Sequence, residues 1–346
     1  MKKIVLIMAA SFAVFILAGC NRSEQAENSG GEPEYKAAVF IPGFIAGSPT
    51  YAMLAEGVEK AAGEMDELTV KLVEGGYDQS TWPEQVTSLA AAGEWDLIIT
   101  TNPSMPEICK KVSREFPEQK FLILDGYLED HPAIHTVFFN QVEQAFLIGY
   151  FGGLVTLSDM EKSNPDKKAG FLAAQEYPVM NQMMKPGYEE GLRYADSEIS
   201  LDFRVLGNWH DASRAAEIAK AMYNAGSDVI LTVAGSANQG VITAAKELNK
   251  YVLWYDTSGY GKAPGTVVGC SQIHLDKAAY EQTIAAVEGK LEFGEAEVLG
   301  VSEGYVGFDT EDPAYKEHVP EGIQNAMQEI LDKLENGEIP LPDNLP

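Results

Sequence analysis

Polar side chains follow several apolar runs of this sequence, in positions where they could hold a small molecule. Asp125 comes directly after the run 120–124, and Asp256 follows the run 251–255. Asn102 follows a third run of the same kind. An ionised carboxylate accepts hydrogen bonds from the hydroxyl groups of a sugar or polyol, and an amide can both donate and accept. These residue types therefore predict a site for a hydroxylated ligand, although a turn or a helix cap would also use them.

Aromatic side chains accompany these polar groups in or beside the predicted strand-to-helix loops. They are Phe44, Tyr51, Trp82, Tyr177 and Trp209. A flat heterocycle needs such faces to stack on and a few polar contacts at its edge. Aromatic residues in loops serve equally as packing, so a core role is the alternative for each of them.

Further candidates for ligand contact are Glu176, Gln272 and the glycine-rich loop that begins at Gly235. That loop lacks the Gly-Lys-Ser/Thr ending of a P-loop, which argues against nucleotide hydrolysis. His131 and His135 are four residues apart, but Pro132 disfavours the helix that would bring them together on a metal. No catalytic constellation is present, so we expect no metal, no cofactor and no enzymatic activity.

The amino-terminal segment predicts export and lipidation. Residues 1–19 have a basic start, a short apolar stretch and small residues before Cys20, as in a secretory signal peptide. The sequence Leu-Ala-Gly-Cys at 17–20 resembles the bacterial lipobox, which implies cleavage before Cys20 and its acylation by lipid such as palmitate. An ordinary signal peptide is the alternative. Residues 20–34 carry this cysteine and a polar tether, so we expect attachment to the cell membrane, facing the periplasm or the exterior.

Composition narrows the class of protein further. The net charge of −27 comes from 52 acidic against 25 basic residues, and such a surface repels nucleic acid. The 45% hydrophobic content suffices for one large or two ordinary domains. Cys109 and Cys270 lie in a predicted helix and a predicted strand, so we expect buried thiols there.

Strand and helix patterns alternate through the rest of the chain. Strands are predicted at 36–41, 68–73, 96–101, 120–124, 168–173, 201–206, 228–233, 251–255 and 266–271. Helices are predicted at 49–62, 82–92, 107–116, 142–157, 179–194, 211–224, 240–248, 276–291 and 321–336. Such alternation is typical of parallel sheets covered by helices on both faces.

The pattern restarts after residue 140, which predicts two α/β lobes. The first takes 35–140 with part of about 256–290, and the second takes 141–255 with part of about 291–320. Residues 321–346 form a carboxyl-terminal helix and tail. In open sheets of this type ligands bind beyond the carboxyl ends of the strands, so we expect the site in a cleft between the lobes.

Many segments together resemble the basic-membrane-protein family of transporter lipoproteins. They are 96–99, 121–125, 146–150, 168–171, 176–179, 187–191, 226–230, 234–240, 255–256 and 336–340. The resemblance implies the type I periplasmic-binding-protein fold, with two doubly wound lobes and a hinged cleft. It also implies an importer of the ABC type with a permease partner, purine nucleosides as the best-known ligands, and ligand roles for Asp125 and Asp256.

Two departures from the family pattern concern the ligand. Members that bind nucleosides carry Asp-Lys-Ser-Phe-Asn after the first strand, where this sequence keeps only an aromatic residue, Tyr51. A ribose-contacting lysine of the family falls at Ile273, beside Gln272. Segments 40–51 and 102–108 resemble a spirochaetal branch of the family that binds riboflavin. Riboflavin or a flavin-like ligand is thus implied, with a purine nucleoside as the alternative and a sensor for a signalling receptor as the second.

Overall fold

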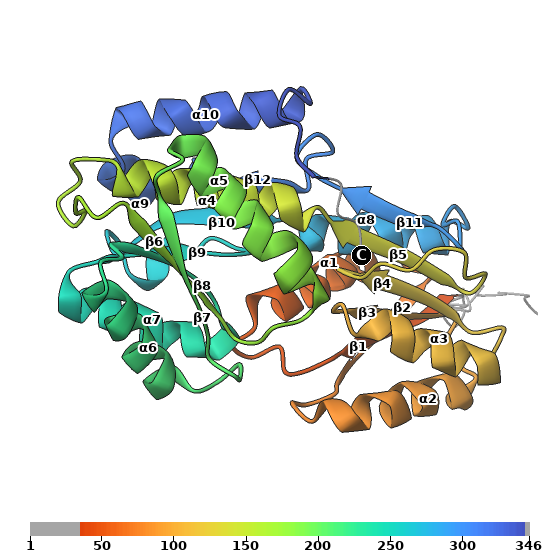
Figure 1. The fold of residues 1–346 in the computed structure, drawn as a ribbon. Coiled ribbons are helices and arrows are strands. Elements are labelled where there is room, and N and C mark those ends of the chain that lie inside the picture. Colours follow the sequence, from red (N-terminus) through yellow and green to blue (C-terminus); the bar gives the residue numbers. More distant parts are fainter. Residues whose placement is uncertain (1–34, 343–346) are drawn as a thin grey trace, which may run out of the picture. The chain divides into compact units, whose positions relative to one another are not determined.

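A computed structural model describes residues 35–342, in which the strands form two sheets of six strands each (Figure 1). The predictions for the signal peptide, Cys20 and the tether lie outside the described residues. Each sheet with its helices is called a lobe below. Every helix within residues 35–342 is too short or too polar to span a bilayer.

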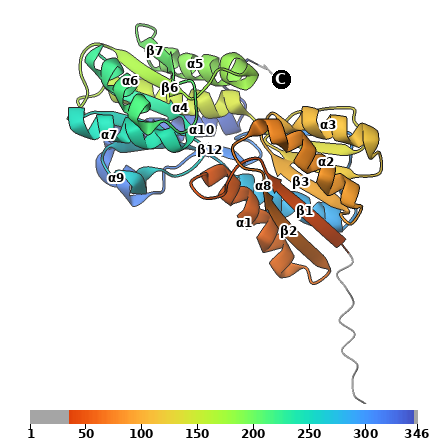
Figure 2. The same cartoon turned by 90° about the horizontal axis from the view of Figure 1, so that it is seen from below.

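Lobe 1 is built on a fully parallel sheet with the order β11-β5-β4-β3-β1-β2. Its strands are β1 (Tyr35–Ile41), β2 (Leu68–Glu74), β3 (Leu97–Thr101), β4 (Lys120–Leu124), β5 (Ile134–Phe139) and β11 (Ala296–Leu299). Its helices are α1 (Pro49–Glu64), α2 (Trp82–Ala92), α3 (Met105–Glu115) and α8 (Leu275–Val287). Figure 2 shows α1 and α8 on one side of this sheet and α2 and α3 on the other.

Burial on both faces explains the continuous apolar runs of these strands. In β1, Val39 and Ile41 pack into one hydrophobic cluster, while Ala38 and Phe40 pack into a separate cluster on the opposite face. All four side chains are fully buried. Because successive residues of a strand point to opposite faces, a strand covered on both sides carries mainly apolar residues.

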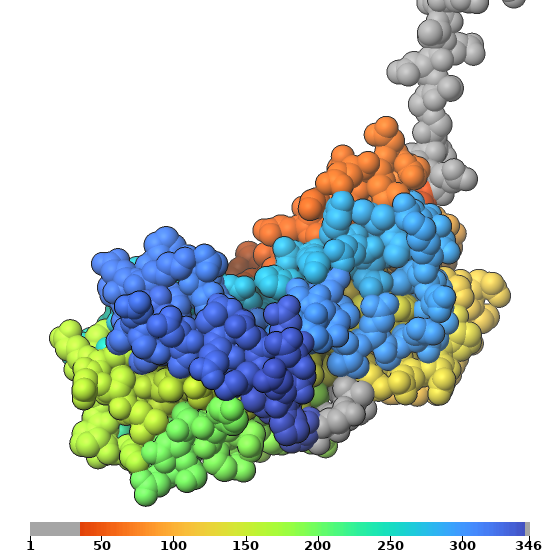
Figure 3. All heavy atoms as spheres, turned by 90° about the horizontal axis from the view of Figure 1, so that it is seen from above, coloured from red at the N-terminus to blue at the C-terminus, as the bar shows by residue number. Residues whose placement is uncertain are grey.

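Lobe 2 has the sheet order β12-β10-β9-β8-β6-β7, in which only β12 runs antiparallel to its neighbour. Its strands are β6 (Lys168–Ala173), β7 (Ser200–Val205), β8 (Val229–Val233), β9 (Tyr251–Trp254), β10 (Val267–Ile273) and β12 (Val306–Phe308). Its helices are α4 (Gln141–Thr156), α5 (Lys185–Ala195), α6 (Ala212–Asn224), α7 (Asn238–Leu248), α9 (Pro313–His318) and α10 (Glu321–Glu335). Figure 3 shows α10, in dark blue, on the surface of this lobe.

Helix α4 forms the centre of lobe 2, as its apolar sequence predicts. Its glycines let α5 pack closely: a Cβ at Gly149 would lie 2.3 Å from the carbonyl oxygen of Tyr188. At its amino end the Asn140 side chain accepts hydrogen bonds from the amides of Val142 and Glu143, both at 3.2 Å. The helix therefore starts at a fixed point, directly after β5 of the other lobe.

The chain passes between the lobes at three crossovers, which are β5 to α4, β10 to α8, and β11 to β12. Strands β5, β11 and β12 and helix α9 were not predicted. The last three of these elements are short, and β5 follows a polar, proline-containing stretch. The helix predicted at 276–291 ends earlier, at Val287, because the left-handed Gly289 (φ 69°) stops it. Asp211 caps α6, accepting from the Arg214 amide at 3.0 Å.

Candidate ligand site

Three predicted site residues follow the ends of strands, two in lobe 1 and one in lobe 2, and lie in the left-handed region of the backbone map. Asn102 after β3 has φ 102°, Asp125 after β4 has φ 58°, and Asp256 after β9 has φ 70°. Asn and Asp tolerate this conformation better than other residues with a side chain. Each residue therefore forms the turn that ends its strand, and the same turn leaves its side chain half-buried at the strand end.

Two glutamines of α4 hold the two carboxylates. Gln141 Nε2 donates to Asp125 Oδ1 at 3.4 Å, and Gln144 Nε2 donates to Asp256 Oδ1 at 3.1 Å. Sequence reasoning missed both, because Gln141 lay outside the predicted helix and Gln144 was interpreted as part of a lobe core. The available signal was their spacing: residues three apart in the first turn of a helix share one face.

Burial perturbs both acids, and the charge of Asp256 adds to the effect on Asp125. Burial, and secondly the negative charge of Asp256, raise the pKa of Asp125 to about 8, while the bond from Gln141 opposes the rise. Burial also raises the pKa of Asp256 to about 6, against the bond from Gln144. No basic side chain within residues 35–342 acts on either carboxyl. The site thus favours hydroxyl or N–H donors and disfavours an anion.

Tyr177 of lobe 2 lies near this acidic pair, and Trp209 packs next to Tyr177. Burial raises the pKa of Tyr177, and so do the charges of Asp125 and Asp256, which places its phenol near both carboxylates. The Trp209 ring lies 6.2 Å from the Tyr177 ring, centroid to centroid, and its Nε1 donates to Gln175 Oε1 at 3.0 Å. Gly235 has φ 57°, and a Cβ there would lie 3.0 Å from the Trp209 carbonyl oxygen. The glycine therefore permits this loop contact.

On the side of lobe 1, Tyr51 lies near the acidic pair. Its hydroxyl donates to the carbonyl of Pro42 at 2.8 Å. Burial raises the pKa of Tyr51 to about 12, a hydrogen bond with Asn102 opposes this rise, and the charge of Asp125 adds to it. The structure thus brings Tyr51, Asn102 and Asp125 together from the ends of three segments of the same lobe.

Phe44 forms an exposed aromatic pair with Tyr77, which sequence reasoning missed. Their ring centroids are 4.9 Å apart in an edge-to-face arrangement, and Tyr77 is 72% exposed. Tyr77 also contributes electrostatically to the pKa of Tyr51, so the pair borders the lobe 1 part of the cluster.

Three predicted residues are not joined to the cluster. Trp82 is buried among the core residues of α2 and α3, and its Nε1 donates to the carbonyl of Gly76 at 3.0 Å, as expected for packing. Glu176 is exposed, and Gln272 pairs through its strand with Gly307. No hydrogen bond within residues 35–342 links the side chains of Glu176 or Gln272 to either carboxylate, so their ligand roles stay predictions.

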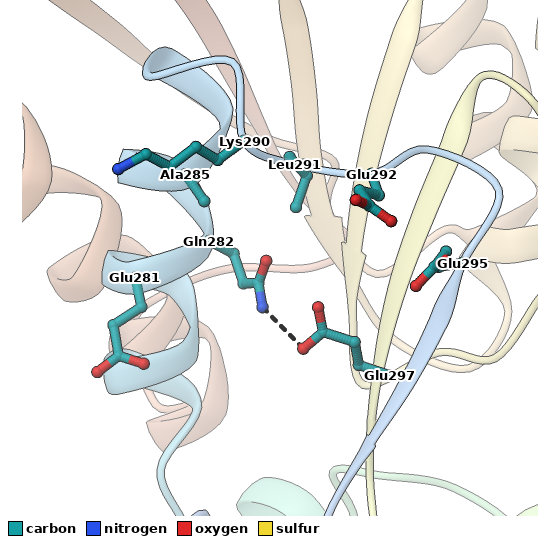
Figure 4. A pocket seen from close by; sticks show the side chains of 8 residues that line it. All are labelled: Glu281, Gln282, Ala285, Lys290, Leu291, Glu292, Glu295 and Glu297. Carbon is teal, nitrogen blue, oxygen red and sulfur yellow. Dashed lines mark hydrogen bonds between the residues drawn. The ribbon is translucent and has the colours of Figure 1, made fainter.

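A separate hollow of about 350 Å³ lies between α8 and β11 of lobe 1 (Figure 4). Four glutamates line it, together with Gln282, Ala285, Lys290 and Leu291. Gln282 Nε2 donates to Glu297 Oε2 at 3.0 Å, and His135 Nε2 lies 3.3 Å from the other oxygen of Glu297. The hollow contains no aromatic face and none of the predicted site residues, so it offers no surface on which a flat ring could stack.

The cysteines and histidines of the described chain form no metal centre. Within residues 35–342 no group of three or more His, Cys, Asp or Glu side chains could hold a metal ion. Cys109 and Cys270 are unpaired and buried, as predicted, and burial raises the pKa of both thiols.

Two lobes of parallel sheet, with polar groups at the carboxyl ends of their strands, define the architecture of a type I periplasmic binding protein. A crystal structure of an ABC transporter solute-binding protein from Aeropyrum pernix K1 has this fold, with a TM-score of 0.76 and 23% identity over 89% of this chain and 94% of that one. The family model described as "ABC transporter substrate-binding protein PnrA-like" matches residues 35–343, and the chain belongs to this family.

Curated relatives agree with this assignment. Basic membrane protein A2 of Borrelia garinii subsp. bavariensis is 25% identical over 350 residues, covering 99% of this chain and 97% of the relative. The ABC transporter nucleoside-binding protein BmpA of Lactococcus lactis subsp. cremoris is 26% identical over 254 residues, covering 72% and 69%. The predicted membership in the basic-membrane-protein family is confirmed: the chain is a substrate-binding protein of an ABC transporter and not an enzyme.

Proposed function

We propose that this substrate-binding protein captures a neutral, flat heterocycle that carries hydroxyl groups, with riboflavin or a flavin-like molecule as the first candidate. The observation that carries the proposal is the pair of carboxylates, Asp125 and Asp256, beside the Tyr177 and Trp209 rings. The carboxylates would accept hydrogen bonds from the ribityl hydroxyls, while the aromatic faces would hold the ring system.

The charge balance of the site supports a neutral ligand. A phosphate group would meet two acids with no compensating basic side chain among the described residues. Hydroxyl donors have the opposite effect, because they stabilise the ionised form of a buried carboxylate. We therefore expect the free vitamin to bind more tightly than its phosphorylated form.

A purine nucleoside is the second candidate, and the nucleoside-binding relative from Lactococcus favours it. Ribose presents two neighbouring hydroxyls, which Asp125 and Asp256 could accept as readily as those of a ribityl chain. The two candidates differ in ring size and in the length of the hydroxylated part.

Isothermal titration calorimetry on the chain from residue 21 onward separates the candidates. We expect heat with riboflavin and quenching of its fluorescence, because aromatic stacking quenches flavins. Lumichrome, which has the ring system without the ribityl chain, should bind much more weakly if the carboxylates accept hydroxyl groups. Heat with guanosine, inosine or adenosine alone would replace riboflavin by a nucleoside, and no heat with any of the four would refute both candidates.

Cys20 is proposed as the lipid anchor that keeps the protein at the membrane beside its permease. The basis is the lipobox-like sequence at 17–20, which precedes a polar segment. Acyl chains would provide membrane attachment that the acidic chain does not provide through its charge.

A further inference from the structure

The first turn of α4 contacts both carboxylates of the ligand site. We infer that Gln141 and Gln144 are positioning residues, which fix the orientation of Asp125 and Asp256 and thereby determine where a ligand must carry its hydrogen-bond donors. This inference rests on the proposed function, because it takes the two carboxylates as ligand contacts.

Gln144 is held in a fully buried place. Its Nε2 donates to Asp256 Oδ1 at 3.1 Å and more weakly to Ser271 Oγ at 3.5 Å. The side chain is 0% exposed, and its Oε1 has no hydrogen-bond partner within residues 35–342. A buried polar atom without a partner destabilises the fold. The unpartnered Oε1 therefore indicates that this glutamine serves through its Nε2. The Nε2 group occupies Oδ1 of Asp256 and leaves its other carboxylate oxygen for a ligand.

Gln141 connects the two lobes. Its Nε2 donates to Asp125 Oδ1 at 3.4 Å, and its Oε1 accepts from the Tyr255 hydroxyl at 3.0 Å. Asp125 ends β4 of lobe 1, whereas Tyr255 follows β9 of lobe 2 and directly precedes Asp256. One amide thus links the acid of one lobe to the backbone segment that carries the acid of the other.

The spacing of the two glutamines on one turn of α4 makes the site selective for the positions of a ligand's donors. Side chains three residues apart on a helix have Cβ atoms about 5–6 Å apart on one face. Because Asn140 caps this turn and fixes its start, the two amides form a rigid pair. The free oxygens of Asp125 and Asp256 are therefore held in a set relative position, which a ligand with suitably spaced hydroxyls can match.

The same bonds keep the acids available as acceptors. The titratable groups that interact with the pair or belong to it come from four segments: Tyr51 of α1, Asp125 after β4, Tyr177 after β6, and Tyr255 with Asp256 after β9. Burial raises the pKa of the tyrosines and keeps them neutral, so the charge that favours protonation of Asp125 is that of Asp256. The donors on α4 oppose this, since a hydrogen bond to the ionised form lowers the pKa.

A titration of the ligand-free protein tests the inference without any ligand. Gln144→Met keeps a side chain of similar size and removes the donor, so the pKa of Asp256, followed by carbon-13 NMR of its carboxyl carbon, should rise relative to the wild type. The matched control is Gln119→Met. Gln119 is also buried, but its side chain donates to the carbonyl of Lys120, the first residue of β4, and not to a carboxylate. An unchanged pKa of Asp256 in Gln144→Met would overturn the inference. Gln141→Met with Asp125 provides the same test should Gln144→Met not fold.

A double-mutant cycle with riboflavin as the probe tests the effect on binding. Gln144→Met should weaken binding by about tenfold, as expected for one lost hydrogen bond to a charged group. In the Asp256→Asn background the same change should cost less than about twofold, since a residue that acts through Asp256 loses its effect with it. Equal losses in both backgrounds would show a packing role instead. If riboflavin does not bind the wild type, the proposed ligand fails, while the NMR titration still decides the positioning role.

Discussion

Replacing Asp125 by Asn should stabilise the ligand-free protein at alkaline pH and weaken its affinity for ligand. Asn has nearly the same shape and tolerates the left-handed backbone of this position (φ 58°). It carries no charge, so it removes both the burial of a carboxylate and the repulsion by Asp256. The substitution therefore separates the stability of the ligand-free protein from its affinity for ligand.

The magnitude follows from the rise of the pKa from 3.8 to about 8. The folded protein binds this proton more tightly than the unfolded chain, so the contribution to stability is fully present below about pH 3.8 and is lost as the pH rises to about 8. Each pKa unit corresponds to about 1.4 kcal/mol, which gives an upper limit of about 6 kcal/mol. Because Asp125 is only half-buried and water screens part of the effect, we expect about 1–3 kcal/mol.

Urea unfolding of wild type and variant at about pH 4.5 and about pH 8.5 measures this difference. The free energies of unfolding should be close at the lower pH, and the variant should be more stable at the higher one. Riboflavin affinity should fall by roughly tenfold, because a neutral amide oxygen is a weaker acceptor than a carboxylate. Asp130→Asn is the matched control, since Asp130 is exposed and also left-handed (φ 60°). A variant that is less stable than wild type at both pH values would refute the reasoning.

Further substitutions test the packing of lobe 1, the aromatic contact and the anchor. Gly57→Ala should destabilise the fold by about 1–3 kcal/mol, because its Cβ would lie 2.2 Å from the Asp276 carbonyl oxygen. Gly63→Ala in the same helix has open space and should stabilise by up to about 1 kcal/mol, so thermal unfolding that moves both variants in the same direction would contradict this packing. Trp209→Ala should weaken riboflavin binding by roughly tenfold in a fluorescence titration, and unchanged affinity would remove this ring from the site. Cys20→Ser should release the protein from membranes without changing its soluble affinity, whereas a variant that still pellets after a high-salt wash would exclude a lipid anchor.

The order of elements could be predicted from the sequence because a buried strand or helix has a recognisable pattern of apolar residues. Strands such as β4 and β6 lie between two layers of helices, so every position after the first lysine is apolar, and their predicted bounds coincide with the observed ones. The same pattern identified Asp125 and Asp256, since a polar residue directly after an apolar run marks the end of a parallel strand. Family resemblance then gave these two residues a role.

The contacts that organise the site became visible only in the tertiary structure. Gln144 and Asp256 are 112 residues apart, and no periodicity in either segment refers to the other. Strand β11 is four residues long and follows α8 by a loop, yet it pairs with β5, whose sequence lies far earlier in the chain. In the sequence Trp82 cannot be distinguished from an aromatic residue of a binding loop, whereas in the structure it is buried in the core beside α2 and α3. A strand or helix is specified by the spacing of its own residues, whereas a hydrogen bond between segments far apart in the sequence depends on how the whole chain packs.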